Sequence, residues 1–370
     1  MTQITEEQIL DALKKVDDPD KKADIVGLGM ISGLRIKDGH VAFAIEVDPE
    51  RGPGLEPLRK EAEKVVHALP GVVSVTVVLT AERTGPAGGN GGAPQAGPGM
   101  ENMMPGTKAI IAVASGKGGV GKSTIAINLA LALAAKGQKI GLLDADIYGP
   151  SMPRMMGISG EPQSSDGRTL DPMENHGIKC MSMGFMVEEE TPIIWRGPMV
   201  QSALQQMMRD INWGELDVLV VDMPPGTGDA QLTMAQQVPL AGAIIVSTPQ
   251  DIALADARKG LNMFRKVDVP VFGIIENMSY FSCPHCGERT EIFSHGGARK
   301  EAELLSTDFL GEIPLDSEIR ETSDSGNPIV VSNPDSAHAK AFHDIADKVA
   351  AKIAEVLEKR QSTTPRIVVS

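Results

Sequence analysis

The chain has 370 residues, of which 42% are apolar and 23% are charged, and its formal net charge is −14. This length allows two domains with sizeable cores, while the acidic balance disfavours sequence-independent binding of nucleic acid, which requires a basic face. The first residues are polar and acidic rather than a signal peptide, and no run of about 18 apolar residues could span a bilayer. Together with the acidic charge, this leads us to expect a cytoplasmic protein whose partners include neither nucleic acid nor a membrane.

Residues 1–83 carry the pattern of a small α/β domain. Segments with apolar residues at helical spacing follow one another there with short segments in which apolar and polar residues alternate, as in strands. The predicted elements, in chain order, are a helix over 6–16, strands over 25–36 and 40–47, a helix over 55–69 and a strand over 72–79.

Residues 84–106 are dense in glycine and proline and contain nothing that could form a core. We predict a flexible linker and a domain boundary there. From residue 107 onward, apolar strands alternate with helical segments, which predicts an α/β fold with a doubly wound, mostly parallel sheet. The candidate strands are 109–114, 139–143, 217–222, 241–247, 269–275 and 309–312. Ligands of such sheets bind at the carboxyl ends of the strands, so the motifs there are the ones that matter.

A glycine-rich turn follows the strand 109–114 and leads into a strong helix former, 125–135. Its spacing fits G-x-x-x-x-G-K-[ST], the phosphate-binding loop. Glycines let backbone N–H groups wrap a triphosphate, Lys122 reaches the β- and γ-phosphates, and the Ser123 hydroxyl holds Mg²⁺. We therefore predict that ATP and Mg²⁺ bind here. The predicted nucleotide-binding residues of the loop are Gly116, Lys117, Gly118, Gly119, Val120, Gly121, Lys122, Ser123 and Thr124.

Acidic residues follow two other strands. Asp144 and Asp146 come directly after 139–143, where they can orient water or Mg²⁺, or cap a helix. The strand 217–222 ends in Asp222, the form of a Walker B acid that holds Mg²⁺ through water. Both strand ends face the phosphate loop in a sheet of the predicted kind.

Cys283 and Cys286 form a Cys-Pro-His-Cys-Gly turn, which is typical of a metal knuckle. Two thiolates make half of a four-cysteine site, and a symmetric dimer would supply the other half. Four thiolates suit Zn²⁺ and an iron–sulfur cluster equally. A zinc site within one chain, made by both cysteines, His295 and one more ligand, stays open, as does a redox dithiol. The third cysteine, Cys180, is isolated and is predicted to be buried in a strand.

Lys117, directly after the first glycine of the loop, matches the K-G-G-x-G-K-[ST] pattern of the deviant Walker A ATPases. In that family the extra lysine crosses a dimer interface to the partner's nucleotide, so the resemblance implies an ATP-hydrolysing homodimer in which Lys117 and Lys122 act in catalysis. Residues 144–151 and 223–229 resemble its switch I and switch II, which implies that Asp146 positions the attacking water. Asn277 matches an asparagine that recognises adenine.

With the cysteine turn added, the order of motifs is similar to that of the Mrp/ApbC group of iron–sulfur cluster carrier ATPases. The matching segments are 117–124, 144–151, 196–199, 222–229, 276–278 and 283–286. The resemblance covers 107–360 closely and, as a small iron–sulfur-assembly-associated domain, 1–83 more loosely. It implies a [4Fe–4S] cluster held by Cys283 and Cys286 at a homodimer interface, with a cluster-assembly scaffold and apo iron–sulfur proteins as partners. Many small domains of this kind carry a cysteine after the second strand. Residues 47–54 have none, which favours a docking or regulatory role.

Two alternatives come from other classes of protein. One is a positioning ATPase of the septum-site or partition type with a structural zinc at the knuckle, and the other is a scaffold in which hydrolysis is vestigial. Septum-site relatives bind membrane through a C-terminal tail, but acidic residues interrupt the basic ones over 336–360. We therefore expect a core-packing helix there, within an ATPase domain over 107–360, and a tail over 361–370.

Overall fold

A computed structural model divides the chain into two compact units, Met1–Pro94 and Gln95–Ser370. The residues that the structure describes are 5–37, 40–47, 56–70, 72, 74–81, 104, 106–187, 197–283 and 285–363. The turn after the second predicted strand, most of the 84–106 linker, Arg196 of the matched segment 196–199, and the last seven residues lie outside them.

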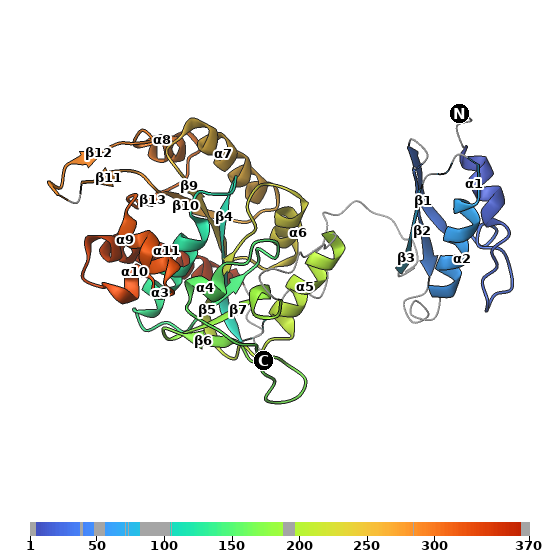
Figure 1. Ribbon diagram of the computed structural model, residues 1–370, viewed down its shortest axis with the longest axis horizontal. Coiled ribbons are helices and arrows are strands. Elements are labelled where there is room, and N and C mark those ends of the chain that lie inside the picture. The colour runs from blue at the N-terminus through green and yellow to red at the C-terminus, as the bar shows by residue number, and fades with distance from the viewer. Residues whose placement is uncertain are drawn as a thin grey trace, which may run out of the picture. The chain divides into compact units, whose positions relative to one another are not determined.

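The first unit packs two helices against one face of a three-stranded sheet (Figure 1). Its elements follow the predicted order, and β2 pairs antiparallel with β1 and parallel with β3. Ile9, Leu13, Phe43 and Val66 are among its buried core residues. The elements are α1 (Glu6–Leu13), β1 (Ile31–Lys37), β2 (His40–Val47), α2 (Glu56–His67) and β3 (Ser74–Ala81).

The predicted strand over 25–36 is wrong in its first half. Residues 25–29 form turns, and β1 begins only at Ile31. The Asp24 carboxylate accepts a hydrogen bond from the Gly27 N–H at 2.6 Å, and Gly29 adopts φ +66°, a left-handed conformation that glycine tolerates. Local side-chain bonding therefore overrides the apolar alternation of this stretch.

The second unit is built on an eight-stranded sheet in the order β13-β10-β9-β4-β8-β5-β7-β6. All neighbours are parallel except β6 and β7. The six predicted strands are present, each shifted by no more than two residues at either end. The strands are β4 (Thr107–Ser115), β5 (Ile140–Asp144), β6 (Met173–Asn175), β7 (Ile178–Ser182), β8 (Leu216–Asp222), β9 (Gly242–Ser247), β10 (Val271–Glu276) and β13 (Phe309–Glu312).

Helices cover both faces of this sheet, which confirms the doubly wound α/β class. On one side α3 packs against α10 and α11, and on the other α7 packs against α6 and α8. Figure 1 shows the β11 (Phe281–Ser282) and β12 (Arg289–Thr290) hairpin projecting from the edge of this unit. The helices are α3 (Lys122–Ala134), α4 (Met152–Met155), α5 (Gly197–Arg209), α6 (Asp229–Gln237), α7 (Asp251–Lys266), α8 (Gly297–Leu304), α9 (Ser317–Asp324), α10 (Ile329–Ser332) and α11 (Ala337–Thr363), with a 3₁₀ turn at Met183–Phe185.

Two strands of the large sheet, and the short β11 and β12, were not among the predicted ones. β6 and β7 form a hairpin whose turn residues, His176 and Gly177, adopt φ +52° and +78°. A hairpin turn of this conformation usually contains Asn-Gly or Asp-Gly, so the sequence His-Gly was a weaker indication of a hairpin. Cys180 lies in β7 and is fully buried, as predicted.

The C-terminal helix α11 packs on α3 and on β13, as expected of a core-packing helix. It continues to Thr363, so the predicted tail over 361–370 is wrong for its first three residues. None of the helices in the described part of the chain combines the length and the apolarity needed to cross a bilayer.

Candidate nucleotide site and cysteine hairpin

The phosphate-binding loop joins β4 to α3 and curls around the first turn of that helix. Gly116 touches α7 so closely that a Cβ would lie 2.1 Å from the carbonyl carbon of Asp256. Gly121 is the N-cap of α3 and has φ +77°, a conformation that disfavours other residues. The amino end of α3 therefore faces a hollow of about 240 Å³, which suits an anion. The lining residues are Ser115, 117–124, Asp146, Ser151, Met155 and Pro225.

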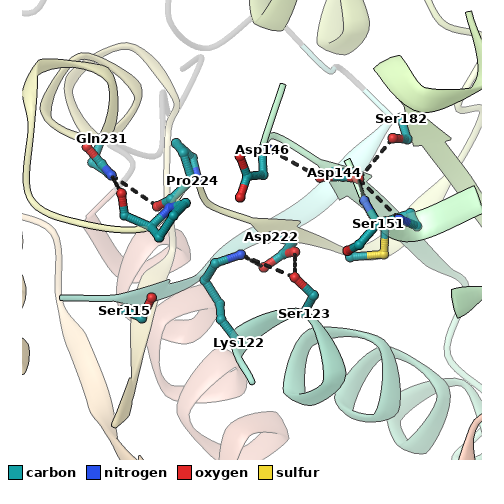
Figure 2. A network of polar contacts seen from close by, with 12 residues as sticks. Ser115, Lys122, Ser123, Asp144, Asp146, Ser151, Ser182, Asp222, Pro224 and Gln231 are labelled. Atoms are coloured by element: carbon teal, nitrogen blue, oxygen red, sulfur yellow. Dashed lines mark hydrogen bonds and ion pairs between the residues drawn. The ribbon is translucent and has the colours of Figure 1, made fainter. Parts of the chain in front are cut away.

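Lys122 and Ser123, which line this hollow, both contact the fully buried Asp222 (Figure 2). The Lys122 ammonium donates to one oxygen of the Asp222 carboxylate, and the Ser123 hydroxyl donates to the other at 2.6 Å. Asp222 is fully buried, and burial raises its pKa while the lysine and the serine oppose that shift. A hydroxyl and a carboxylate side by side are hard oxygen donors of the kind that Mg²⁺ accepts beside phosphates.

The two carboxylates after β5 have separate roles. Asp144 is buried, and its Oδ2 accepts hydrogen bonds from the Ser182 hydroxyl at 2.9 Å and from the Ser151 and Met152 N–H groups at 3.1 and 3.3 Å (Figure 2). Burial and the nearby Asp222 raise the pKa of Asp144 to about 7. Asp144 thus caps the start of α4 and holds both ends of the 145–151 loop together.

Asp146 instead lines the hollow and is only half-buried. Its backbone N–H donates to Asp144 Oδ1 at 3.1 Å, which fixes the start of the loop. Burial raises the pKa of the Asp146 carboxyl, and the Lys122 charge opposes that shift. Of the two predicted acids, Asp146 is therefore the one that reaches the space where a nucleotide would react.

The segment after Asp222 is braced by Gln231, which sequence analysis missed. The Gln231 amide on α6 donates to the carbonyls of Pro224, at 3.1 Å, and Pro225 (Figure 2). The Gly226 N–H donates to the carbonyl of Ser115 at the end of β4, 3.0 Å away. These contacts dock the switch II segment beside the phosphate loop. A glutamine inside a helix carries no sequence signal for such a role.

Asn277, at the end of β10, contacts the phosphate loop itself. Its amide Nδ2 donates to the carbonyl of Val120 at 2.8 Å, and its side chain is buried. A Cβ on Gly121 would lie 2.2 Å from the same Nδ2 atom. The structure thus assigns Asn277 a contact with the loop, and its role in adenine recognition stays a prediction.

Lys117 lies on the open side of the loop. The Ser115 hydroxyl donates to its carbonyl at 2.9 Å. Among the described residues, no carboxylate forms an ion pair with its ammonium group, whereas Lys122 is paired with Asp222. The catalytic role predicted for Lys117 at a dimer interface stays a prediction.

Cys283 and Cys286 occupy the turn of the β11–β12 hairpin; Pro284 between them lies outside the described residues. The Cys283 N–H donates to the carbonyl of Glu288 at 2.9 Å, and the Gly287 N–H donates to the carbonyl of Cys283 at 2.8 Å. Hydrogen bonds from the backbone of Cys286 and His285, and from the Cys286 thiol, lower the pKa of Cys283. A tight turn that stabilises a thiolate and leaves Cys286 exposed is suited to binding a soft metal centre.

His295 does not join the cysteines. Its ligand atoms group with those of Glu276 and Glu312, and within the described ranges no third metal-ligating side chain completes a group with Cys283 and Cys286. This geometry disfavours the single-chain zinc site that included His295. Cys180 is not placed to act as a metal ligand, because it is fully buried in β7.

Comparison with protein-family models matches residues 106–350 to the NUBPL iron-transfer P-loop NTPase family and residues 6–77 to an iron–sulfur cluster assembly protein family. An iron–sulfur cluster carrier protein of Synechocystis is 47% identical over 356 residues, which cover 95% of this chain and 98% of that protein. The iron–sulfur cluster transfer protein NUBPL of Mus musculus is 56% identical over 255 residues, covering 68% of this chain and 80% of that one.

Among solved structures, a nucleotide-binding protein of Archaeoglobus fulgidus in complex with ADP is 39% identical, with a TM-score of 0.57 over 66% of this chain and 95% of that chain. The septum site-determining protein MinD of Pyrococcus horikoshii, complexed with Mg-ADP, is 22% identical, with a TM-score of 0.50 over 68% of this chain and 98% of that chain. The second similarity establishes the fold alone.

Proposed function

Because the chain belongs to the NUBPL iron-transfer family of P-loop NTPases, we propose that it is an ATP-hydrolysing carrier that holds a [4Fe–4S] cluster between two copies of itself and passes it to apo iron–sulfur proteins. One observation carries the proposal. A full set of phosphate-site residues and the half-buried Cys283 with the exposed Cys286 lie in one unit, and within the described residues these two cysteines have no third ligand.

The nucleotide chemistry follows from the residues around the hollow. Lys122 exchanges its contact with Asp222 for the β- and γ-phosphates, Ser123 and Asp222 hold Mg²⁺, and the ion neutralises charge on the phosphates. Asp146 orients the attacking water from its half-buried position beside the loop. Backbone N–H groups at the start of α3 complete the electrostatic stabilisation. The ADP in the related Archaeoglobus protein supports nucleotide binding here.

Two features call for a second copy of the chain. Lys117 is free of a carboxylate partner among the described residues, and Cys283 and Cys286 supply half of a four-thiolate set. A two-fold dimer satisfies both, because it brings each Lys117 to the partner's nucleotide and places four thiolates around one cluster. The lowered pKa of Cys283 favours the thiolate form that binds iron.

The domain roles belong to the same proposal. Residues 1–83 act as a docking or regulatory domain joined by the 84–106 linker to the ATPase domain over 107–360. Their match to an iron–sulfur cluster assembly family supports contact with the scaffold that donates the cluster.

The test is anaerobic reconstitution with iron and sulfide. We expect a broad absorption band near 400 nm and about two irons per chain, as one [4Fe–4S] cluster per dimer requires. The Cys283→Ala/Cys286→Ala double variant should lose both. Cys180→Ala is the matched control and should keep them, because Cys180 is buried in β7.

A colourless wild type with about half a zinc per chain would overturn the carrier proposal and favour the positioning ATPase with a structural knuckle. A Lys122→Ala variant that hydrolyses ATP at the wild-type rate would overturn the assignment of the nucleotide site. Unchanged maturation of apo-proteins by an inactive Lys122→Ala variant would favour the scaffold alternative.

A further inference from the structure

We propose that Arg289 is a positioning residue that couples the nucleotide state of the phosphate loop to the cysteine hairpin. The inference rests on the proposed function, in that it takes the hollow at α3 as the nucleotide site and Cys283 and Cys286 as the metal site. It concerns the energetic link between these two sites.

The end of β10 contacts both sites through successive residues. Asn277 reaches the phosphate loop, where its amide donates to the carbonyl of Val120 at 2.8 Å and packs against Gly121. Glu276, the residue before it, is fully buried and bonds the start of α8 instead. A displacement of the loop at Val120 therefore acts directly on the strand end that carries Glu276.

Glu276 ties that strand end to the segment that follows the hairpin. Its carboxylate accepts hydrogen bonds from the Ser279 hydroxyl at 2.6 Å and from the Gly296 and Ala298 N–H groups at 3.2 and 2.7 Å. The Gly296 and Ala298 N–H groups lie at the start of α8, whose N-cap residue, Gly296, has no side chain that could accept their hydrogen bonds. The Ser279 hydroxyl also lies 3.4 Å from both His295 Nδ1 and Glu312 Oε2.

Arg289 connects this cluster to the hairpin. It belongs to β12, three residues after Cys286, and one guanidinium nitrogen donates to Glu312 Oε1 at 3.2 Å. The other donates to His295 Nδ1 at 2.9 Å, and the guanidinium lies 3.7 Å from the centre of the Tyr280 ring, just before β11. Both strands of the hairpin are thus fastened at their base by one side chain.

The same contacts explain why Glu276, His295 and Glu312 are better described as an arginine anchor than as a metal site. The ligand atoms of the three residues lie within 4.8 Å of one another. The Arg289 guanidinium already bonds two of them and supplies the positive charge that the two carboxylates require. The cluster is therefore satisfied by the protein itself.

Coupling of this kind is reciprocal, since a nucleotide that changes metal affinity must have its own affinity changed by the same factor. The ratio of metal affinities with and without nucleotide is thus the quantity to measure. Without Arg289, the hairpin loses the side chain that holds its base to Glu312 and His295. The thiolates remain, so metal binding persists while its response to nucleotide is lost.

The experiment titrates Co²⁺ into the full-length, metal-free chain with and without Mg-ADP and follows the thiolate-to-cobalt absorption bands at fixed protein concentration. The Cys283→Ala/Cys286→Ala variant gives the baseline. For the wild type we expect the two affinities to differ by at least about 5-fold, the lower end of typical couplings. For Arg289→Ala we expect them to agree within about 2-fold.

Arg289→Lys keeps the charge but loses the planar fork and should recover only part of the ratio. Arg320→Ala, which removes an exposed arginine paired with Glu321 and Asp324 on α9, is the matched control and should behave as wild type. Mg-ADP affinity with and without Co²⁺ should show the same ratios.

If Arg289 has only a structural role, Arg289→Ala will weaken Co²⁺ binding equally with and without Mg-ADP and leave the ratio of affinities unchanged, and that result overturns the inference. A wild-type ratio of one overturns it as well. Because the assay needs no cluster, a chain that takes up no iron–sulfur cluster yet shows the Arg289-dependent ratio would refute the proposed function and leave the coupling standing. A wild type in which Co²⁺ does not bind the two cysteines overturns the inference, while the reconstitution with iron and sulfide decides the proposed function separately.

Discussion

Gly116→Ala tests whether the phosphate loop is fixed by its contact with α7. The new Cβ would lie 2.1 Å from the carbonyl carbon and 2.2 Å from the carbonyl oxygen of Asp256, more than 1 Å closer than the 3.4 Å at which ordinary contact begins. These are backbone atoms in the middle of a 16-residue helix, so they cannot rotate away. Overpacking typically costs about 1–3 kcal/mol, and a backbone clash belongs at the upper end. We expect a loss of about 3 kcal/mol, or roughly 6–12 °C in Tm for a domain of this size.

Gly118→Ala is the matched control, because it changes the same loop by the same methyl group. A Cβ at Gly118 would have its nearest neighbour, Pro225 Cβ, at 3.9 Å. Urea unfolding of the two variants and the wild type measures the difference. Gly116→Ala should be the less stable variant by at least about 2 kcal/mol. If the two variants unfold within about 0.5 kcal/mol of each other, the contact with α7 does not hold the loop and the reasoning fails.

Three further predictions concern single side chains. In metal-free protein, the rate at which iodoacetamide alkylates Cys283 should rise with pH with an apparent pKa below that of the same cysteine in urea. The reason is that its thiolate is stabilised only in the folded protein. Identical pH profiles of the folded and the urea-unfolded protein would contradict this. Lys122→Ala should leave the buried Asp222 without its cation and lower the free energy of unfolding by about 3 kcal/mol. The variant should also hydrolyse ATP at least about 10²-fold more slowly. A variant as stable as wild type would argue against the buried pair. Asn277→Ala should cost about 1–3 kcal/mol in urea unfolding, because the Val120 carbonyl loses its donor; a neutral result would mean that water replaces the amide.

The sheet and the phosphate loop could be predicted because their signals are local. A run of buried apolar residues, a glycine-rich turn and a helix former follow one another within 107–135, and each element needs only its own sequence. Asp222 was predictable for the same reason, as an acid at the end of an apolar strand. The separation of Asp144 from Asp146 was not, because it depends on Ser182, a residue that reaches Asp144 only through the pairing of β5 and β7.

The anchor at the base of the cysteine hairpin was equally hidden. Arg289, His295 and Glu312 lie on three separate segments, and no spacing in the chain relates them. The two cysteines were predictable because metal knuckles have a short, recognisable pattern. The residues that hold the knuckle were not, since side-chain contacts between segments leave no periodic trace in a single sequence.

The two edges of the large sheet are short: β13 has four residues and β6 has three. Along β13, Lys348 of α11 donates to the carbonyl of Leu310 at 2.7 Å, so this backbone acceptor already has a partner. Short and partly covered edges give another polypeptide little backbone to pair with, so this sheet resists growth by strand addition. Copies of this unit should therefore associate through side-chain surfaces and loops, and a crowded or heated sample should be slow to form cross-β aggregates from its folded state.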